Sequence, residues 1–249
     1  MTTEPIGCGV RRMCIAVDLE HYGRRPDAGQ IEAQRAMTVL LRDVGERGAL
    51  ERAQWLTQQQ GDGELALLPP GIDEAHVITA LWRELREGLH RYNRHANAKA
   101  RLRMRVAVHE GQTYIADNGF AGDAINTVCR LRDCAEVKDA LSAAEGDLVL
   151  IVSDRIFCDV IRGYDAHDLP ASAFAEATIV MPDKEFRARA FIFSADGSAR
   201  HGPGGASAEH APRSADGGEA GSGAVINFHA KVNARDIADT INNNYGTTR

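Results

Sequence analysis

The apolar pattern in the first part of the chain switches between the two periods that distinguish strands from helices. Short apolar runs or strict alternation predict strands, and apolar residues spaced three and four apart predict helices. The predicted elements, in order, are a strand at 14–19, a helix at about 30–48, strands at 55–60 and 64–68, a helix at about 74–95 and a strand at about 102–108. Their order is β-α-β-β-α-β.

This order predicts an α+β, ferredoxin-like fold. A right-handed crossover makes the first two strands of such a fold parallel, and the third strand returns antiparallel between them. Asp18 ends the first strand, and Asp62 begins an Asp-Gly pair that predicts a type I′ hairpin turn. Both carboxylates are therefore expected at one end of the sheet, where they can hold hard divalent cations. A turn with no other role is the alternative for Asp62.

Further elements are predicted after this core. Residues 119–133 predict a glycine-rich turn that runs into a helix, on which Asn126 and Arg130 share a face. An amide and a guanidinium so placed can donate hydrogen bonds to a ribose oxygen or to a phosphate that gains charge. Two ordinary surface residues are the alternative. A strand at 148–152, a short helix at about 154–162 and a strand at 186–193 complete the domain.

Composition divides the chain into four parts. Residues 1–12 are predicted to be a weakly structured lead and 13–193 a globular domain. Residues 194–223 are rich in Gly, Ala, Ser and Pro, which predicts a flexible linker. The tail at 224–249 alternates apolar and polar residues and contains three consecutive asparagines, a pattern typical of segments that stack into cross-β ladders. A terminal segment without a role, or a strand that docks on the domain, is the alternative.

Composition also excludes several classes of function. The 249 residues carry a net charge of −6 without a basic stripe, which argues against nucleic-acid binding. The five cysteines lack paired spacing and predict neither a disulfide framework nor a zinc site. The sequence shows no signal peptide and no apolar run of about 20 residues, so we expect a cytoplasmic protein without a membrane partner.

Four motifs give the chain a resemblance to a known family. AVDLEHYG, GDGELALL, RVAVHEG and GFAGDAINTVCRL occur in this order, and residues 12–193 resemble the class III nucleotidyl cyclase homology domain. The resemblance implies a ferredoxin-like core with extra C-terminal strands and helices, in a head-to-tail homodimer with composite sites. It implies that Asp18 and Asp62 bind two Mg²⁺ or Mn²⁺ ions. Asn126 would orient the ribose of a nucleoside triphosphate, and Arg130 would stabilise the transition state.

The chain departs from this family at the two positions that read the purine base. Gln58 stands where the family has a lysine, and Gly119 stands where it has an acidic residue. The resemblance therefore leaves the base open: another kind of base reader, a pyrimidine substrate or no substrate are all compatible with these residues. It also places a contact to the triphosphate at Lys184, or at Arg187 or Arg189 beside it.

Two further resemblances and three hypotheses follow. The stretches VDLEHYGRR, QGDGELA and VCRL resemble an actinobacterial group of cyclase-like proteins, and the tail resembles C-terminal amyloid signalling motifs of multicellular bacteria. The first hypothesis is a cyclase that converts a nucleoside triphosphate to a cyclic nucleotide. The second is a catalytically silent sensor or adaptor, acting in defence signalling, whose tail self-assembles or templates onto a protein partner. The third is another ferredoxin-like two-metal enzyme, such as a polymerase-like synthase.

Overall fold

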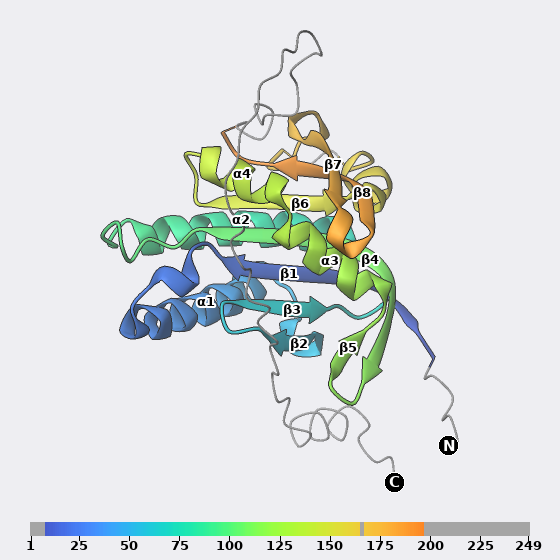
Figure 1. The fold of residues 1–249 in the computed structure, drawn as a ribbon, viewed down its shortest axis with the longest axis horizontal. Coiled ribbons are helices and arrows are strands. Elements are labelled where there is room, and N and C mark those ends of the chain that lie inside the picture. Colours follow the sequence, from blue (N-terminus) through green and yellow to red (C-terminus); the bar gives the residue numbers. More distant parts are fainter. Residues whose placement is uncertain (1–7, 165–166, 197–249) are drawn as a thin grey trace, which may run out of the picture. The chain divides into compact units, whose positions relative to one another are not determined.

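A computed structural model of the chain describes residues 8–164 and 167–196. In this part of the chain, the strands form one mixed sheet with helices on both faces (Figure 1). The strand order is β2-β3-β1-β4-β6-β8-β7, and the short β5 pairs with β4 outside this order. The predicted tail at 224–249 and most of the predicted linker at 194–223 lie outside the described residues.

The first six elements follow the predicted β-α-β-β-α-β order. They are β1 (Val10–Leu19), α1 (Asp27–Arg47), β2 (Leu56–Gln59), β3 (Gly63–Leu67), α2 (Glu74–Asn93) and β4 (Met104–Ala116). Strand β3 pairs antiparallel with both β1 and β2, so that β1 and β2 are parallel with β3 between them. The ferredoxin-like core and its strand arrangement are therefore confirmed.

Local sequence signals explain where the two helices of this core begin and end. The Asp73 carboxylate accepts a hydrogen bond from the backbone N–H of His76 at 3.0 Å and caps α2. Helix α1 ends at Arg47, with Gly48 as its C-cap. It begins three residues before the predicted start, directly after Pro26, whose fixed φ suits the entry into a helix.

Strands β1 and β4 are longer than predicted. β1 begins at Val10, inside the segment expected to be a weakly structured lead, and β4 continues to Ala116. The two strands pair antiparallel at ten successive positions, from Val10 opposite Thr113 to Leu19 opposite Met104. Each strand supplies the backbone partners that the other needs, so the pairing extends beyond the apolar residues on which the prediction was based.

The elements after β4 complete the sheet and cover its second face. They are β5 (Gly119–Ala121), α3 (Asp123–Asp133), α4 (Ala135–Ala143), β6 (Leu148–Ser153), α5 (Asp154–Ile156) with a π-helical turn at Phe157–Ile161, β7 (Ala175–Met181) and β8 (Phe186–Phe193). The helix predicted after the glycine-rich turn within 119–133 corresponds to α3, and the predicted strands at 148–152 and 186–193 correspond to β6 and β8. Helix α4 and strand β7 were not predicted, because both are short and rich in small residues.

Two hydrophobic layers lie on opposite faces of the sheet. The odd-numbered residues of β1 from Met13 to Leu19 belong to the layer formed with α1 and α2. Cys14 and Ala16 belong to the other layer, which is formed with α3 and α4. Because side chains alternate along a strand, Asp18 lies on the α3 and α4 side of the sheet. The fold thus places the first predicted site residue under the helix that carries Asn126.

The hairpin turn between β2 and β3 differs in type from the prediction. The backbone N–H of Gln60 donates to the carbonyl oxygen of Gly63 at 2.9 Å, so the two central residues are Gly61 and Asp62 rather than Asp62 and Gly63. Gly61 has a φ of 80°, and Asp62 has no positive φ. The backbone N–H of Asp62 also donates to the carbonyl oxygen of Gln60 at 3.0 Å, so the turn contains a three-residue γ-turn centred on Gly61. Asp62 still lies at the tip of the hairpin.

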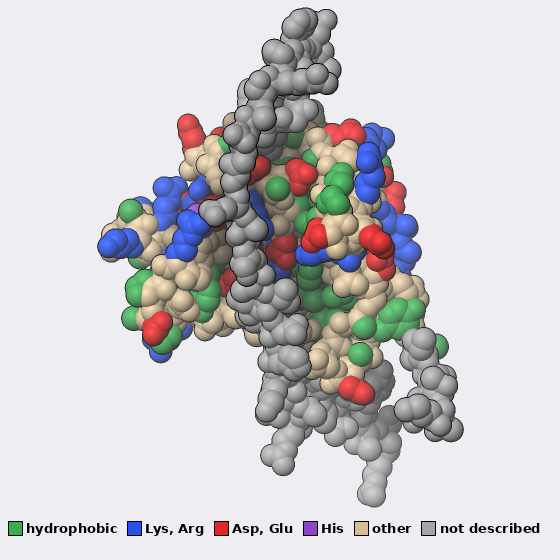
Figure 2. All heavy atoms as spheres, in the orientation of Figure 1, with side chains coloured by type: hydrophobic (Ala, Val, Ile, Leu, Met, Phe, Trp, Pro, Cys, Tyr) green, Lys and Arg blue, Asp and Glu red, His purple; other side chains and the backbone are tan. Residues whose placement is uncertain are grey.

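Within residues 8–164 and 167–196, no helix is both long and apolar enough to cross a lipid bilayer. The five cysteines are free thiols. On the face shown in Figure 2, basic and acidic side chains are interspersed. This distribution agrees with the absence of a basic stripe in the sequence.

The contact between β1 and β3 depends on a glycine. A Cβ added to Gly63 would lie 2.3 Å from the carbonyl oxygen of Val17. We expect Gly63→Ala to lower the free energy of unfolding by about 2 kcal/mol or more, because backbone would have to move. Urea unfolding of the full chain measures this. Gly23→Ala is the control, because an added Cβ there meets nothing within 4 Å. Equal effects of the two substitutions would contradict the conclusion that the contact between β1 and β3 requires glycine at position 63.

His109 on β4 makes stability depend on pH. Its Nδ1 is buried without a hydrogen-bond partner, and burial lowers the pKa of the imidazole, although the nearby carboxylates of Asp123 and Glu110 oppose this shift. As pH falls below about 6.5, the unfolded chain takes up a proton before the folded chain does, so folding stability decreases. The expected loss is at most about 1.4 kcal/mol per pH unit.

Unfolding of the wild type and of His109→Asn between pH 8 and pH 5.5 measures this contribution. The stability of the variant should fall less over this range, and the difference at pH 8 serves as the control because it reports the packing cost alone. Parallel pH profiles of the two proteins would show that His109 does not titrate with a lowered pKa.

Candidate functional site

Strand pairing brings Asp18 and Asp62 to the same end of the sheet. Asp18 lies opposite Gly63 in the pairing of β1 with β3. The backbone N–H of Leu19 donates to the carbonyl oxygen of Asp62 at 2.9 Å. The residue after Asp18 is thus bonded to Asp62 itself. The expectation that these two residues are neighbours is confirmed at the level of the backbone.

The Asp18 carboxylate is held by a cation from the neighbouring strand. Asp18 lies opposite Arg105 in the pairing of β1 with β4. Arg105 Nε donates to Asp18 Oδ1 at 2.9 Å, and Arg105 Nη2 donates to Asp18 Oδ2. The two side chains are 8% and 11% exposed. Burial raises the pKa of Asp18, and the guanidinium of Arg105 opposes this shift, so the carboxylate is desolvated but paired.

The donor chemistry of these residues fits a hard divalent cation. Each oxygen of Asp18 accepts one hydrogen bond from Arg105 and keeps a second lone pair. Asp62 is half-buried, and no described residue forms a hydrogen bond or ion pair with its carboxylate. Within the described residues, no group of three or more His, Cys, Asp and Glu side chains is arranged to hold a metal. The two carboxylates would therefore bind a cation together with water or phosphate oxygens, as is usual for Mg²⁺.

Helix α3 carries the two predicted catalytic residues on its outer part. It begins directly after Gly122, whose φ of 118° favours glycine. Asn126 is exposed, and Arg130 is half-buried with its guanidinium carbon 5.1 Å from the centre of the Phe186 ring. In the described part of the chain, no hydrogen bond joins either residue to Asp18 or Asp62. Within one chain, Asn126 and Arg130 therefore lie on α3 without a hydrogen bond to Asp18 or Asp62, which lie at the end of the sheet.

The two predicted base-reading positions lie against each other. A Cβ added to Gly119 would lie 2.5 Å from Gln58 Oε1, and Gly119 has a φ of 112°. The first value shows that the Gln58 amide occupies the space of a side chain at position 119. The second is a backbone conformation that residues with a Cβ rarely adopt. The backbone conformation therefore disfavours any side chain at position 119, and a side chain there would also have to displace the Gln58 amide.

The three candidate triphosphate contacts differ in their surroundings. Lys184 is exposed in the turn between β7 and β8 and lies close enough to α3 to influence the pKa of Cys129. Arg189 is paired with Glu176 at 2.7 Å and with Asp154 at 2.9 Å. Its charge is thus matched by two carboxylates, whereas Lys184 and the exposed Arg187 have no salt-bridge partner among the described residues.

Sequence reasoning missed the cations around Asp18. Arg101, Arg103 and Arg105 alternate with the apolar residues of the strand predicted at about 102–108, a pattern that by itself indicates only a half-buried strand. In the structure, Arg105 pairs with Asp18 and Arg103 pairs with Glu20 at 3.2 Å. The sequence alternation alone cannot identify these ion pairs. Their identification also requires the pairing register of β1 against β4.

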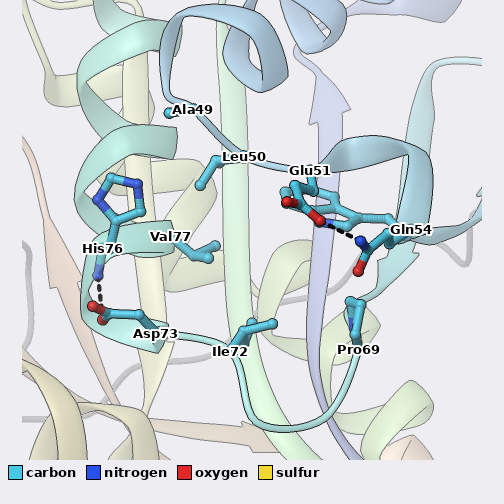
Figure 3. A pocket seen from close by; sticks show the side chains of 10 residues that line it. Ala49, Leu50, Glu51, Gln54, Pro69, Ile72, Asp73, His76 and Val77 are labelled. Atoms are coloured by element: carbon cyan, nitrogen blue, oxygen red, sulfur yellow. Dashed lines mark hydrogen bonds between the residues drawn. The ribbon is translucent and has the colours of Figure 1, made fainter.

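Two hollows lie near the end of α1, and neither contains a predicted site residue. The smaller, of about 190 Å³, is shown in Figure 3, where His76 and Asp73 form one wall. The larger, of about 780 Å³, lies beside β2 and is lined by the ion pair of Arg52 and Glu64. The predicted site residues thus lie outside both hollows.

Comparison with solved structures identifies the fold. The structure of the guanylyl cyclase Cya2 matches with a TM-score of 0.54 and 13% sequence identity, over 76% of this chain and 93% of that chain. The adenylate/guanylate cyclase/hydrolase from Silicibacter pomeroyi matches with a TM-score of 0.50 and 18% identity, over 75% of this chain and 98% of that chain. No protein-family model and no curated protein sequence matches the chain. At these identities the similarity is one of fold: the chain has the fold of adenylate and guanylate cyclase domains.

Proposed function

We propose that the protein is a nucleotidyl cyclase that converts a nucleoside triphosphate to a cyclic nucleotide. The observation that carries the proposal is the pairing of β1 with β3, which sets Asp18 opposite Gly63 and bonds Leu19 to Asp62. Two carboxylates at one end of a sheet suit the binding of a metal-bound triphosphate. The cyclase fold supports this function over other reactions at two-metal sites.

In this reaction the 3′-hydroxyl of the ribose attacks the α-phosphate, and pyrophosphate leaves. Asp18 and Asp62 would hold two Mg²⁺ or Mn²⁺ ions, which supply Lewis-acid stabilisation of the charge on the phosphate oxygens. Arg105 keeps the Asp18 carboxylate in one orientation through two parallel hydrogen bonds. Lys184 and Arg187 are better placed than Arg189 to contact the triphosphate, because Arg189 is already paired.

Asn126 and Arg130 would act from a second copy of the chain. Asn126 is exposed on α3, and within the described residues neither side chain bonds to the aspartates of its own chain. A head-to-tail homodimer would bring α3 of one copy to Asp18 and Asp62 of the other. There the amide could orient the ribose, and the guanidinium could stabilise charge in the transition state.

The base would be read by uncharged groups. Gln58 carries an amide that can both donate and accept hydrogen bonds, and it lies against Gly119. An amide can pair with either a purine or a pyrimidine edge. All four ribonucleotides are therefore candidate substrates.

Product analysis tests the proposed activity. The full chain is incubated with ATP, GTP, CTP or UTP and Mn²⁺, and the products are identified by mass spectrometry. We expect a cyclic nucleotide and pyrophosphate, and we expect Asp62→Asn to lower the rate at least about 100-fold because a metal ligand is lost. Asp139→Asn, which changes an exposed carboxylate on α4, is the matched control. Linear products would favour a polymerase-like synthase, and nucleotide binding without any product would favour the silent sensor.

Mixing two inactive variants tests the composite site. Arg130→Ala removes the transition-state cation and should lower the rate on the order of 100-fold. In an equimolar mixture with Asp62→Asn, half of the dimers contain one copy of each variant, and each mixed dimer has one intact site. We expect recovery of about a quarter of the wild-type activity if the chains exchange freely. No recovery in a mixture shown to contain mixed dimers would mean that both residues act within one chain.

A further inference from the structure

A buried guanidinium at the end of α3 connects this helix to the turn that carries Asp62. Arg132 Nη1 donates to Gln60 Oε1 at 2.5 Å. Arg132 Nε and Nη2 donate to the carboxylate of Asp133 at 2.8 and 3.1 Å. The Arg132 side chain is 13% exposed. Because the guanidinium is planar, partners on two of its sides fix its orientation.

Gln60 connects Arg132 to the turn through its backbone hydrogen bonds. Its backbone N–H donates to the carbonyl oxygen of Gly63 at 2.9 Å, and its carbonyl oxygen accepts from the backbone N–H of Asp62 at 3.0 Å. The backbone of Gln60 therefore holds both ends of the turn, while its side chain is held by Arg132. Hydrogen bonds therefore connect α3 to Asp62: Arg132 bonds to the side chain of Gln60, and the backbone of Gln60 bonds to the backbone N–H of Asp62.

The same helix carries the other half of the proposed site. Arg130 lies two residues before Arg132, and its guanidinium lies over the Phe186 ring on β8. Fixing α3 to the turn in each chain fixes the spacing between Arg130 and Asp62 within that chain. In a symmetric pair of chains, this spacing also determines how α3 of one chain meets the turn of the other.

We propose that Arg132 is a positioning residue that holds the β2–β3 turn, through Gln60, in the geometry in which Asp62 binds a divalent cation. The cation-binding part of this inference rests on the proposed function, whereas the positioning of the turn rests on the contacts alone. A merely structural role is the alternative: Arg132 could stabilise the C-terminal end of α3 by its charge and its pair with Asp133, without any effect on the turn.

Two single variants and their combination distinguish these roles. Arg132→Lys keeps the charge but loses the planar fork, and Gln60→Met keeps the length of the side chain but loses the amide. Arg86→Lys makes the same change as the first variant at an exposed position on α2 and is the control. Hydrogen exchange of peptides that span residues 56–68 reports the turn in the full chain, and Mn²⁺ titration followed by electron paramagnetic resonance reports cation affinity without turnover.

We expect faster exchange in the turn for both single variants, and no increase in the double variant beyond that of Gln60→Met, because the contact between Arg132 and Gln60 is already lost in that variant. Mn²⁺ affinity should fall on the order of tenfold in each, as is usual when a residue that orients a metal ligand is lost. Unchanged exchange, or effects that add in the double variant, would overturn the proposal. Faster exchange in the turn with unchanged Mn²⁺ affinity would also overturn the proposal. If the wild type binds no Mn²⁺, the proposed metal site fails, and the exchange data alone decide whether Arg132 positions the turn.

Discussion

The pairing of β1 with its two neighbours is the constraint on which the rest of this structure depends. β1 lies between β3 and β4, and its side chains contribute to the hydrophobic layers on both faces of the sheet. A shift of one residue in this pairing would move every β1 side chain to the opposite face. The register is therefore strongly specified, and it sets Asp18 opposite both Gly63 and Arg105. The candidate site is a direct product of core packing.

The ion pairs at this end of the sheet lie largely buried next to the hydrophobic core. Asp18 with Arg105 joins β1 to β4, and Glu20 with Arg103 joins the residue after β1 to the residue before β4, on the side covered by α3 and α4. Taking such charges out of water is costly, and loss of one partner from a buried pair typically costs about 3–5 kcal/mol. A pair of this kind contributes little net stability but allows few alternative arrangements, so it keeps a carboxylate that could bind a cation in a single orientation.

The sequence was sufficient for the order of the core elements and for the proximity of Asp18 and Asp62, because both follow from hydrophobic periodicity and from the handedness of the crossover. The predicted type I′ turn was wrong, because the hydrogen bond of Gln60 to Gly63 makes Gly61 and Asp62 the central residues, and Asp62 lacks the positive φ that a type I′ turn requires. The role of Arg105 was missed because it depends on a register between strands 87 residues apart in sequence. Contacts of this range leave no periodic signal in either segment.

The contact between Gln58 and Gly119 restricts which substitutions these two positions could accept during evolution. A side chain at position 119 needs a different backbone conformation and also needs the space that the Gln58 amide fills. The restriction falls on position 119, because Gly119 presents no side chain to a new residue at position 58. A shift in base preference that places a charged residue at position 119 would therefore be favoured by a smaller residue at position 58, and it would still require a change of backbone conformation. Sequence changes at one of the two positions should depend on the residue already present at the other.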